Sequence, residues 1–248
     1  MTATAEAFPS LGSPPPVVLS WSSGKDSAYA LHVLRREHHV EVVGLLTTVT
    51  DTFSRVSMHG VREELLERQA DAAGLPLYRV RLPYPCPNEV YEREMGTVLA
   101  DLRGRGIRRV AFGDLFLEEV RAYRESRMRE AGMECLFPLW GRETGPLARE
   151  MIDAGVRARL ACVDPRKLDR SFAGRPFDAP LLAALPANVD PCGERGEFHT
   201  FVSDGPMFEH AVPVRVGEVV ERDGFVFADL LPGAGPEAAA GPGAEREG

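Results

Sequence analysis

The sequence lacks the features that mark a membrane protein, a disulfide framework or a zinc knuckle. No run of about 18 apolar residues is present, so we expect no transmembrane helix and no membrane partner. The four cysteines lie far apart and form no Cys-x-x-Cys pair, so they are expected to be free thiols. Residues 1–16 show neither the basic start nor the apolar segment of a signal peptide. We therefore expect a cytoplasmic protein.

Basic residues, and lysine above all, are in short supply. The 248 residues include 29 Lys and Arg against 37 Asp and Glu, which gives a formal net charge of −8. Proteins that wrap nucleic acid are usually basic, so this balance disfavours a nucleic-acid partner. Only positions 25 and 167 are lysine, and Lys25 lies inside the strongest motif of the chain.

What the sequence does contain is a regular alternation of apolar runs and helical patterns. Strands are expected at 17–21, 42–46, 77–82, 109–112 and 135–137, and helices at 26–37, 61–73, 90–105, 121–131 and 146–154. Such alternation is typical of an α/β fold, a doubly wound parallel sheet with helices on both faces. Residues 17–155 are therefore expected to form the main domain.

The pattern changes after Gly155. Further strands are expected at 159–163, 198–202, 212–220 and 225–230, with short helical pieces between the first two. We expect residues 156–232 to form a smaller α+β region. The small, Pro- and Gly-rich ends, 1–16 and 233–248, are expected to be a disordered leader and tail.

The strongest motif is the turn Ser22-Ser23-Gly24-Lys25-Asp26-Ser27, which joins the first expected strand to the first expected helix. Ligands of open α/β sheets bind beyond the carboxyl ends of the strands, and a helix N-terminus offers unpaired N–H groups to phosphate. The serine hydroxyls could donate to the same phosphate, Lys25 could neutralise its charge, and Asp26 could cap the helix or hold Mg²⁺. The turn therefore predicts a nucleotide site.

Other motifs of similar appearance do not fit this turn. A Walker A loop needs glycine at position 19 and serine or threonine at position 26, where the chain has Leu19 and Asp26. A nucleophile elbow needs glycine at position 20, which is Ser20. The plain alternative is a Ser- and Gly-rich connection with an aspartate cap and no ligand.

The turn resembles the S-G-G-x-D-S signature of the PP-loop ATP pyrophosphatases. This resemblance implies their adenine nucleotide α-hydrolase (HUP-like) fold and the use of ATP. Ser23 departs from the signature, which has glycine at that place. A serine fits there only if the residue does not need a positive φ.

A second stretch dense in reactive side chains covers residues 190–202. If its last part is extended, Glu197 and His199 share one face and could act together on a proton. A metal site made by Cys192, Glu194 and His199 is an alternative. The plain alternative is a polar turn that leads into an edge strand and binds nothing.

This second stretch resembles the C-G-E-x-G-E-x-H-T signature of the diphthine–ammonia ligase family, a branch of the PP-loop enzymes. The resemblance extends over residues 17–231 and includes 113–114, 137–140 and 204–208. It implies an enzyme that uses ATP and Mg²⁺ to adenylate a substrate carboxylate, releases pyrophosphate and lets ammonia displace AMP. The composition is typical of a bacterial relative, whose acceptor would differ from diphthine. A homodimer is suggested by the family alone.

The motifs and the resemblance together define sets of expected site residues. The expected catalytic residues are Lys25, Asp26, Glu194, Glu197 and His199. The expected nucleotide-binding residues are Ser22, Ser23, Gly24, Lys25, Asp26, Ser27, His59, Arg62, Gly113 and Asp114. Arg124, Arg127 and Thr200 are expected to bind the substrate, and Asp26 and Asp114 to hold Mg²⁺. The plain alternatives are a helix cap for His59, a turn residue for Asp114 and a solvated helix face for the two arginines.

Two other functions stay open from the sequence. Sulfur transfer to a tRNA base occurs on the same fold, but it usually needs a reactive cysteine pair, which the cysteine spacing does not supply. A non-catalytic module would bind an adenine nucleotide without releasing pyrophosphate.

Overall fold

The larger sheet is centred on β1 (Pro16–Ser20), whose Val-Val-Leu core is buried on both faces. The computed structural model describes residues 14–37, 39–50, 55–56 and 60–234. On one side of β1 lie β2 (Glu41–Thr50) and then β4 (Leu77–Leu82), and on the other side lie β5 (Arg109–Ala111) and then β6 (Glu134–Leu136), all parallel. The short β3 (Arg55–Val56) pairs antiparallel with the end of β2.

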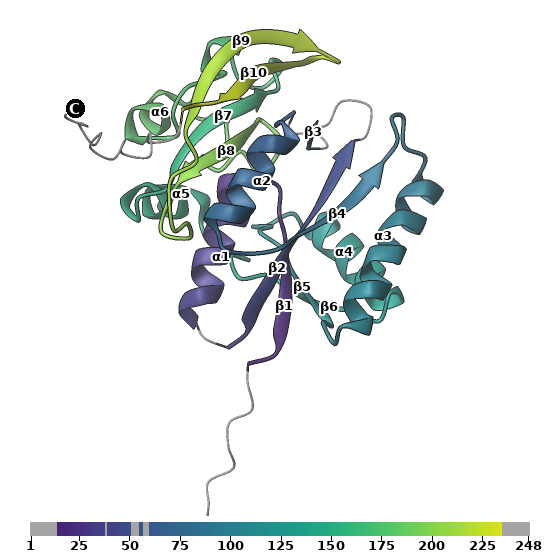
Figure 1. Cartoon of the computed structure of the whole chain (residues 1–248). Coiled ribbons are helices and arrows are strands. Elements are labelled where there is room, and N and C mark those ends of the chain that lie inside the picture. The colour runs from purple at the N-terminus through teal and green to yellow at the C-terminus, as the bar shows by residue number, and fades with distance from the viewer. Residues whose placement is uncertain (1–13, 38, 51–54, 57–59, 235–248) are drawn as a thin grey trace, which may run out of the picture.

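Helices cover both faces of this sheet (Figure 1). One face packs against α1 (Lys25–Glu37) and α2 (Glu63–Ala72), joined by α5 (Thr144–Asp153), and the other against α3 (Asn88–Gly104) and α4 (Glu118–Glu130). Val17 and Leu19 of β1 belong to the first core and Val18 to the second, as the alternation of side chains along a strand requires. Because the strand order reverses between β1 and β5, a crevice is expected outside their carboxyl ends.

The C-terminal part of the chain forms a separate antiparallel sheet. Its strands are β7 (Arg157–Val163), β8 (Phe198–Asp204), β9 (Val214–Arg222) and β10 (Phe225–Pro232), in the spatial order β8–β7–β10–β9. The 3-10 helix η1 (Arg170–Phe172) and α6 (Ala179–Ala184) lie between β7 and β8 in the chain. Asp223 and Gly224 join β9 to β10 with φ of 53° and 78°, as a tight hairpin turn requires.

The two sheets share one hydrophobic core. Val17 and Leu19 of β1 belong to the same buried cluster as Phe198 and Phe201 of β8 and Leu230 of β10. Figure 1 shows the smaller sheet beside α1 and α2, on the side away from α3 and α4. The smaller sheet reaches this core through the helices, because α1 contacts both β1 and β8, and α2 contacts β10.

The predicted doubly wound α/β fold with an additional C-terminal α+β part is confirmed. The helices and strands expected in 17–155 are present with small shifts at their ends, and β3 is an addition that the sequence did not indicate. The division into domains at 155 stays a prediction. The expected leader and tail lie almost wholly outside the described residues. Within those residues, no helix combines the length and the apolar character needed to cross a membrane.

Candidate functional site

Two adjoining cavities lie at the carboxyl ends of β1 and β5, where the strand order reverses. The smaller cavity, of about 220 Å³, is lined mainly by the 22–27 turn, Gly113, Asp114 and the 192–200 segment. The larger cavity, of about 850 Å³, runs between α3 and α4 and has a largely apolar lining. Residues that line both are Ser20, Ser22, Phe112, Arg124 and His199, so the two spaces adjoin.

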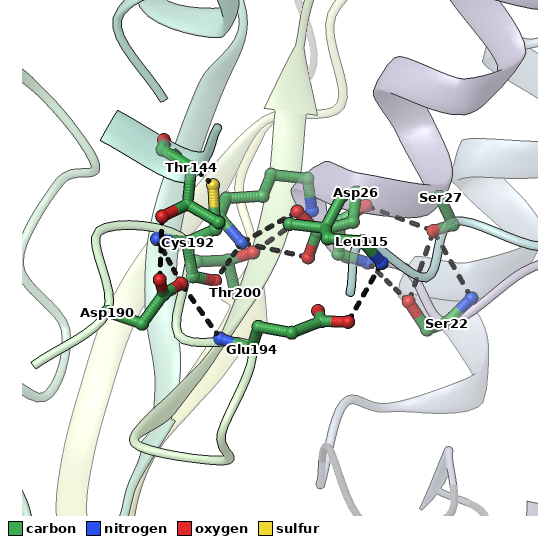
Figure 2. A network of polar contacts seen from close by, with 11 residues as sticks. Ser22, Asp26, Ser27, Leu115, Thr144, Asp190, Cys192, Glu194 and Thr200 are labelled. Carbon is green, nitrogen blue, oxygen red and sulfur yellow. Dashed lines mark hydrogen bonds and ion pairs between the residues drawn. The ribbon is translucent and has the colours of Figure 1, made fainter. Parts of the chain in front are cut away.

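The 22–27 turn is closed by its own serines (Figure 2). The Ser27 hydroxyl donates to Gly24 O at 3.0 Å and lies 3.1 Å from the Ser22 hydroxyl oxygen. α1 begins at Lys25, and the residues of its first turn line the smaller cavity. N–H groups at such a helix start have no partner within the helix, and this end of a helix attracts phosphate.

β8 of the smaller sheet holds this turn in place. Thr200 Oγ1 accepts a hydrogen bond from Lys25 N at 3.0 Å (Figure 2), and Val202 N donates to Ser23 O at 3.0 Å. Gly24 passes so close to β8 that a Cβ on it would lie 3.2 Å from Thr200 O. The Thr200 hydroxyl thus supports the turn, and since Thr200 also lines the smaller cavity, its expected contact with the substrate stays a prediction.

Ser23 adopts a positive φ of 70°. The sequence led us to expect that a serine fits this place only if no positive φ is needed. That condition is not met, and Ser23 lies in the left-handed region that glycine enters freely. Its side chain is fully buried, and its hydroxyl has no hydrogen-bond partner within the described part of the chain. Ser22 and Ser27 line the smaller cavity, whereas Ser23 is not among the described residues that line either space.

The Lys25 ammonium lies at the wall of the smaller cavity and is only 2% exposed. It contacts the two carboxylate oxygens of Asp26 at 2.9 and 2.8 Å and donates to the carbonyl of Cys192. The rings of Phe177 and Phe198 lie 5.5 and 5.6 Å from Nζ. Burial lowers the pKa of Lys25, but attraction to Asp26 and other nearby acids outweighs it, so the pKa is raised. The ammonium is therefore charged at neutral pH.

Asp190 organises the segment that carries the Cys192 carbonyl. Its buried carboxylate accepts hydrogen bonds from Thr144 Oγ1 at 2.7 Å, Cys192 N at 2.9 Å and Glu194 N at 3.2 Å (Figure 2). Gly193 has a φ of 70°, and a Cβ there would lie 2.8 Å from Phe198 O. Sequence reasoning did not single out Asp190, whose only signal is its place at the start of the 190–202 stretch.

Glu194 is the acid of this segment that lines the smaller cavity. Its Oε1 accepts a hydrogen bond from Leu115 N at 2.8 Å (Figure 2). Burial is the main cause that raises the pKa of Glu194 to about 7, and the negative charges of Asp26 and Asp114 act in the same direction. A carboxyl group with a pKa near neutrality can both accept and donate a proton.

Glu197 and His199 have different surroundings, contrary to the shared role expected from their spacing. His199 lines both cavities, and burial together with the charge of Lys25 lowers its pKa to about 4, so its imidazole is neutral at neutral pH. Glu197 is buried, and its Oε1 accepts a hydrogen bond from Asp190 N at 3.0 Å. As far as the described residues extend, Glu197 lines neither cavity and supports the Asp190 turn instead.

Gly113 and Asp114 follow β5 and line the smaller cavity as expected, but the glycine makes room for protein and not for a ligand. A Cβ on Gly113 would lie 2.8 Å from the carbonyl carbon of Asp26 and 2.9 Å from Ser27 N. Glycine therefore lets the chain after β5 touch the first turn of α1. Asp114 forms an ion pair with Arg124, with Oδ2 and Nε 2.6 Å apart.

The chain matches two family models in succession. "Diphthamide synthase N-terminal domain" matches residues 16–135, and "Diphthamide synthase C-terminal domain" matches residues 143–227. Proteins named diphthine–ammonia ligase from Bos taurus and Homo sapiens are each 27% identical to it over 230 residues, which cover 84% of this chain and 86% of theirs. This chain belongs to the diphthine–ammonia ligase family.

Two further matches cover a smaller share of the two chains compared. The diphthine–ammonia ligase of Schizosaccharomyces pombe is 28% identical over 220 residues, 81% of this chain and 36% of that longer protein. Among solved structures, the U34-tRNA thiolase NcsA from Methanococcus maripaludis with its [4Fe-4S] cluster is similar over 56% of each chain, with 16% identity and a TM-score of 0.35. A likeness this slight has no bearing on the chemistry of a diphthine–ammonia ligase family member.

In this family member, the arginines expected at phosphate or substrate are engaged in ion pairs. Arg62 donates two hydrogen bonds to the carboxylate of Asp229 on β10, at 3.2 and 2.6 Å. Arg62 is not among the described residues lining the cavities, and its expected contact with the nucleotide stays a prediction. Arg127 lines the larger cavity but pairs with Glu92 at 2.7 Å and Glu130 at 3.1 Å. His59, the remaining predicted nucleotide ligand, lies outside the described residues.

The described part of this diphthine–ammonia ligase family member holds no metal site made by protein alone. The described residues contain no group of three or more His, Cys, Asp or Glu arranged to hold a metal ion, so the alternative site at Cys192, Glu194 and His199 is wrong. Mg²⁺ is usually bound by one or two carboxylates together with phosphate oxygens and water. Asp26 and Asp114 line the smaller cavity, where they pair with Lys25 and Arg124, and their expected part in holding Mg²⁺ stays a prediction.

Proposed function

We propose that this protein is an ATP-dependent amide ligase that adenylates a carboxylate, releases pyrophosphate and transfers the acyl group to ammonia. The observation that carries the proposal is the charged Lys25 ammonium beside the first turn of α1, in a small polar cavity that adjoins a large apolar one. The polar cavity suits the phosphates, and the apolar one suits adenosine and the acceptor. The name of the relatives, diphthine–ammonia ligase, denotes a ligation of this kind.

In the first step, a carboxylate oxygen of the acceptor attacks the α-phosphorus, and the bond from this phosphorus to the oxygen bridging the β-phosphate breaks. Negative charge then develops on the departing pyrophosphate. Lys25 and the N–H groups of the first turn of α1 lower the barrier because they stabilise this charge more in the transition state than in the ground state. Mg²⁺ held by Asp26 or Asp114 together with the phosphates would add positive charge there.

In the second step, the ammonia nitrogen attacks the acyl carbon, and AMP leaves with the electron pair of the carbon–oxygen bond. The new carbon–nitrogen bond leaves the nitrogen with a surplus proton. We propose that Glu194 accepts it, because this carboxyl lines the phosphate cavity and has a pKa of about 7. The neutral His199, which lines both cavities, is placed to position ammonia or the acceptor by hydrogen bonding.

Three of the four cysteines are poorly suited to sulfur transfer. Burial raises the pKa of Cys135 to about 11 and those of Cys162 and Cys192 to about 12. These three groups therefore keep their protons at neutral pH, whereas sulfur chemistry requires a thiolate.

Product analysis tests the proposal. The protein is incubated with ATP, Mg²⁺ and ammonium, with and without cell extract as the source of the acceptor, and the nucleotide products are quantified. We expect AMP and pyrophosphate in equal amounts only when extract is present, and neither with Lys25→Met. ATP that binds without being cleaved would identify a nucleotide-binding module, and ADP with phosphate would refute attack at the α-phosphorus.

A further inference from the structure

Gln69 of α2 is fully buried beside the nucleotide turn and uses its oxygen and its nitrogen as hydrogen-bonding groups. Trp21 Nε1 donates to Gln69 Oε1 at 2.9 Å. Gln69 Nε2 donates to Ser23 O at 3.1 Å and to Val202 O at 2.6 Å. One side-chain amide thus links α2, the end of β1, the turn and β8.

The bond to Ser23 falls at the most strained residue of the turn. Ser23 holds a φ of 70°, which is unfavourable for any residue that carries a Cβ. Its carbonyl receives both the Gln69 amide and Val202 N, the latter at 3.0 Å. Its neighbours Ser22 and Gly24 line the smaller cavity, so a rotation at Ser23 would displace the groups that face the phosphates.

We propose that Gln69 is a positioning residue that holds the nucleotide turn in its binding shape through the carbonyl of Ser23. The proposal rests on the proposed nucleotide site. Gln69 is itself absent from the described lining of both cavities, so it acts through the backbone of the turn and not by touching ATP. Glycine would enter the left-handed region unaided, but serine at this place needs donors that fix its carbonyl.

An amide is the group that meets the needs of all three partners. The indole N–H of Trp21 requires an acceptor, while the carbonyls of Ser23 and Val202 require donors, and glutamine offers both in one group. Glutamate keeps an acceptor but has no N–H. Methionine has a similar length and shape but neither hydrogen-bonding group. Either substitution leaves the buried carbonyls without this donor.

Calorimetric titration of the full-length protein with α,β-methylene-ATP and Mg²⁺ tests the proposal. Gln69→Met should weaken binding about tenfold or more, because it removes the bond to Ser23 O of the turn and the bond to Val202 O of β8. Ser23→Gly should bind about as well as the wild type. The double variant should regain most of the lost affinity, because glycine adopts the positive φ without help. Tyr29→Phe, which removes the 2.6 Å bond from α1 to Glu150, is the matched control and should not change the affinity.

The possible outcomes separate positioning from mere stability. If Gln69→Met melts at a lower temperature but binds the analogue as tightly as the wild type, the proposal is refuted. If the double variant binds no better than Gln69→Met, action through Ser23 is refuted. A wild type that does not bind the analogue overturns the proposed function as well, so the two failures are distinguishable.

If Gln69→Met does not fold, a second substitution and a measurement on the wild type still test the proposal. Gln69→Glu keeps the oxygen that Trp21 needs but offers at most one O–H donor in place of the two N–H donors, so it should also weaken binding. In the wild type, the side-chain amide protons of Gln69 should exchange slowly with solvent and change their NMR frequencies when the analogue binds. Rapid exchange with no change on binding would overturn the proposal.

Discussion

Replacing Glu194 by glutamine should stabilise the folded protein, and the gain should grow with pH. Glu194 lies in the smaller cavity near Asp26 and Asp114, where burial raises its pKa to about 7. Glutamine keeps the shape of the side chain and an oxygen that can accept the hydrogen bond from Leu115 N. The substitution therefore removes the cost of ionising a buried carboxyl group and changes little else.

The expected size follows from the pKa values of Glu194 in the unfolded and folded chain. These are 4.5 and about 7, and each pH unit between them is worth ~1.4 kcal/mol, which gives ~3 kcal/mol in total. Below pH 4.5 the group is protonated in both states, and the cost is absent. Between 4.5 and 7 the folded state binds more protons than the unfolded one, so wild-type stability falls as the pH rises. Above about pH 7 Glu194 is ionised in both states, so the loss of wild-type stability stays constant.

Urea unfolding of both proteins at several pH values from about 4 to about 8 measures this difference. The free energy of unfolding of Glu194→Gln should equal that of the wild type at the acid end and exceed it by ~3 kcal/mol at the alkaline end. Glu218→Gln on the exposed strand β9 controls for the loss of one negative charge. A difference that does not vary with pH, or that has the opposite sign, would show that the cavity does not perturb this carboxyl group.

Three further substitutions test other parts of the site. Gly113→Ala should lower the free energy of unfolding by ~2 kcal/mol, because its Cβ meets the backbone of Asp26; unchanged urea unfolding would contradict the contact. Lys25→Met should cost ~3 kcal/mol by leaving the Asp26 carboxylate unpaired, and adding Asp26→Asn should recover part of this in the same assay. Arg62→Ala should cost at most ~1 kcal/mol through the lost pair with Asp229 and leave the affinity for α,β-methylene-ATP unchanged by calorimetry. A large loss of affinity in Arg62→Ala would instead support the expected contact of this arginine with the nucleotide.

The fold and the place of the site were predictable from local patterns. Alternating strands and helices imply a parallel sheet, and the 22–27 turn must then lie at its carboxyl edge, where Gly113 and Asp114 also follow a strand. These inferences need only the direction of each strand. They do not require knowledge of which residues far apart in the chain touch.

Local patterns do not reveal the roles that long-range contacts decide. Arg62 has the right place in the chain for a phosphate ligand, but its partner Asp229 lies 167 residues away. Glu194 and Glu197 are alike in spacing, and only the fold shows that one lines a cavity while the other is buried behind Asp190. Gln69 carries no signal at all, because a glutamine within an amphipathic helix is expected to be exposed.

The unbroken core beneath the two sheets constrains how this chain can be recombined. A chimera that joined residues 16–135 of one relative to residues 143–227 of another would bring together side-chain volumes from different proteins, beginning with α1 against β8 and α2 against β10. It would also have to rebuild the contact between the Lys25 ammonium and the Cys192 carbonyl across the new junction. The two segments are separate as sequence patterns, but their side chains form one hydrophobic core.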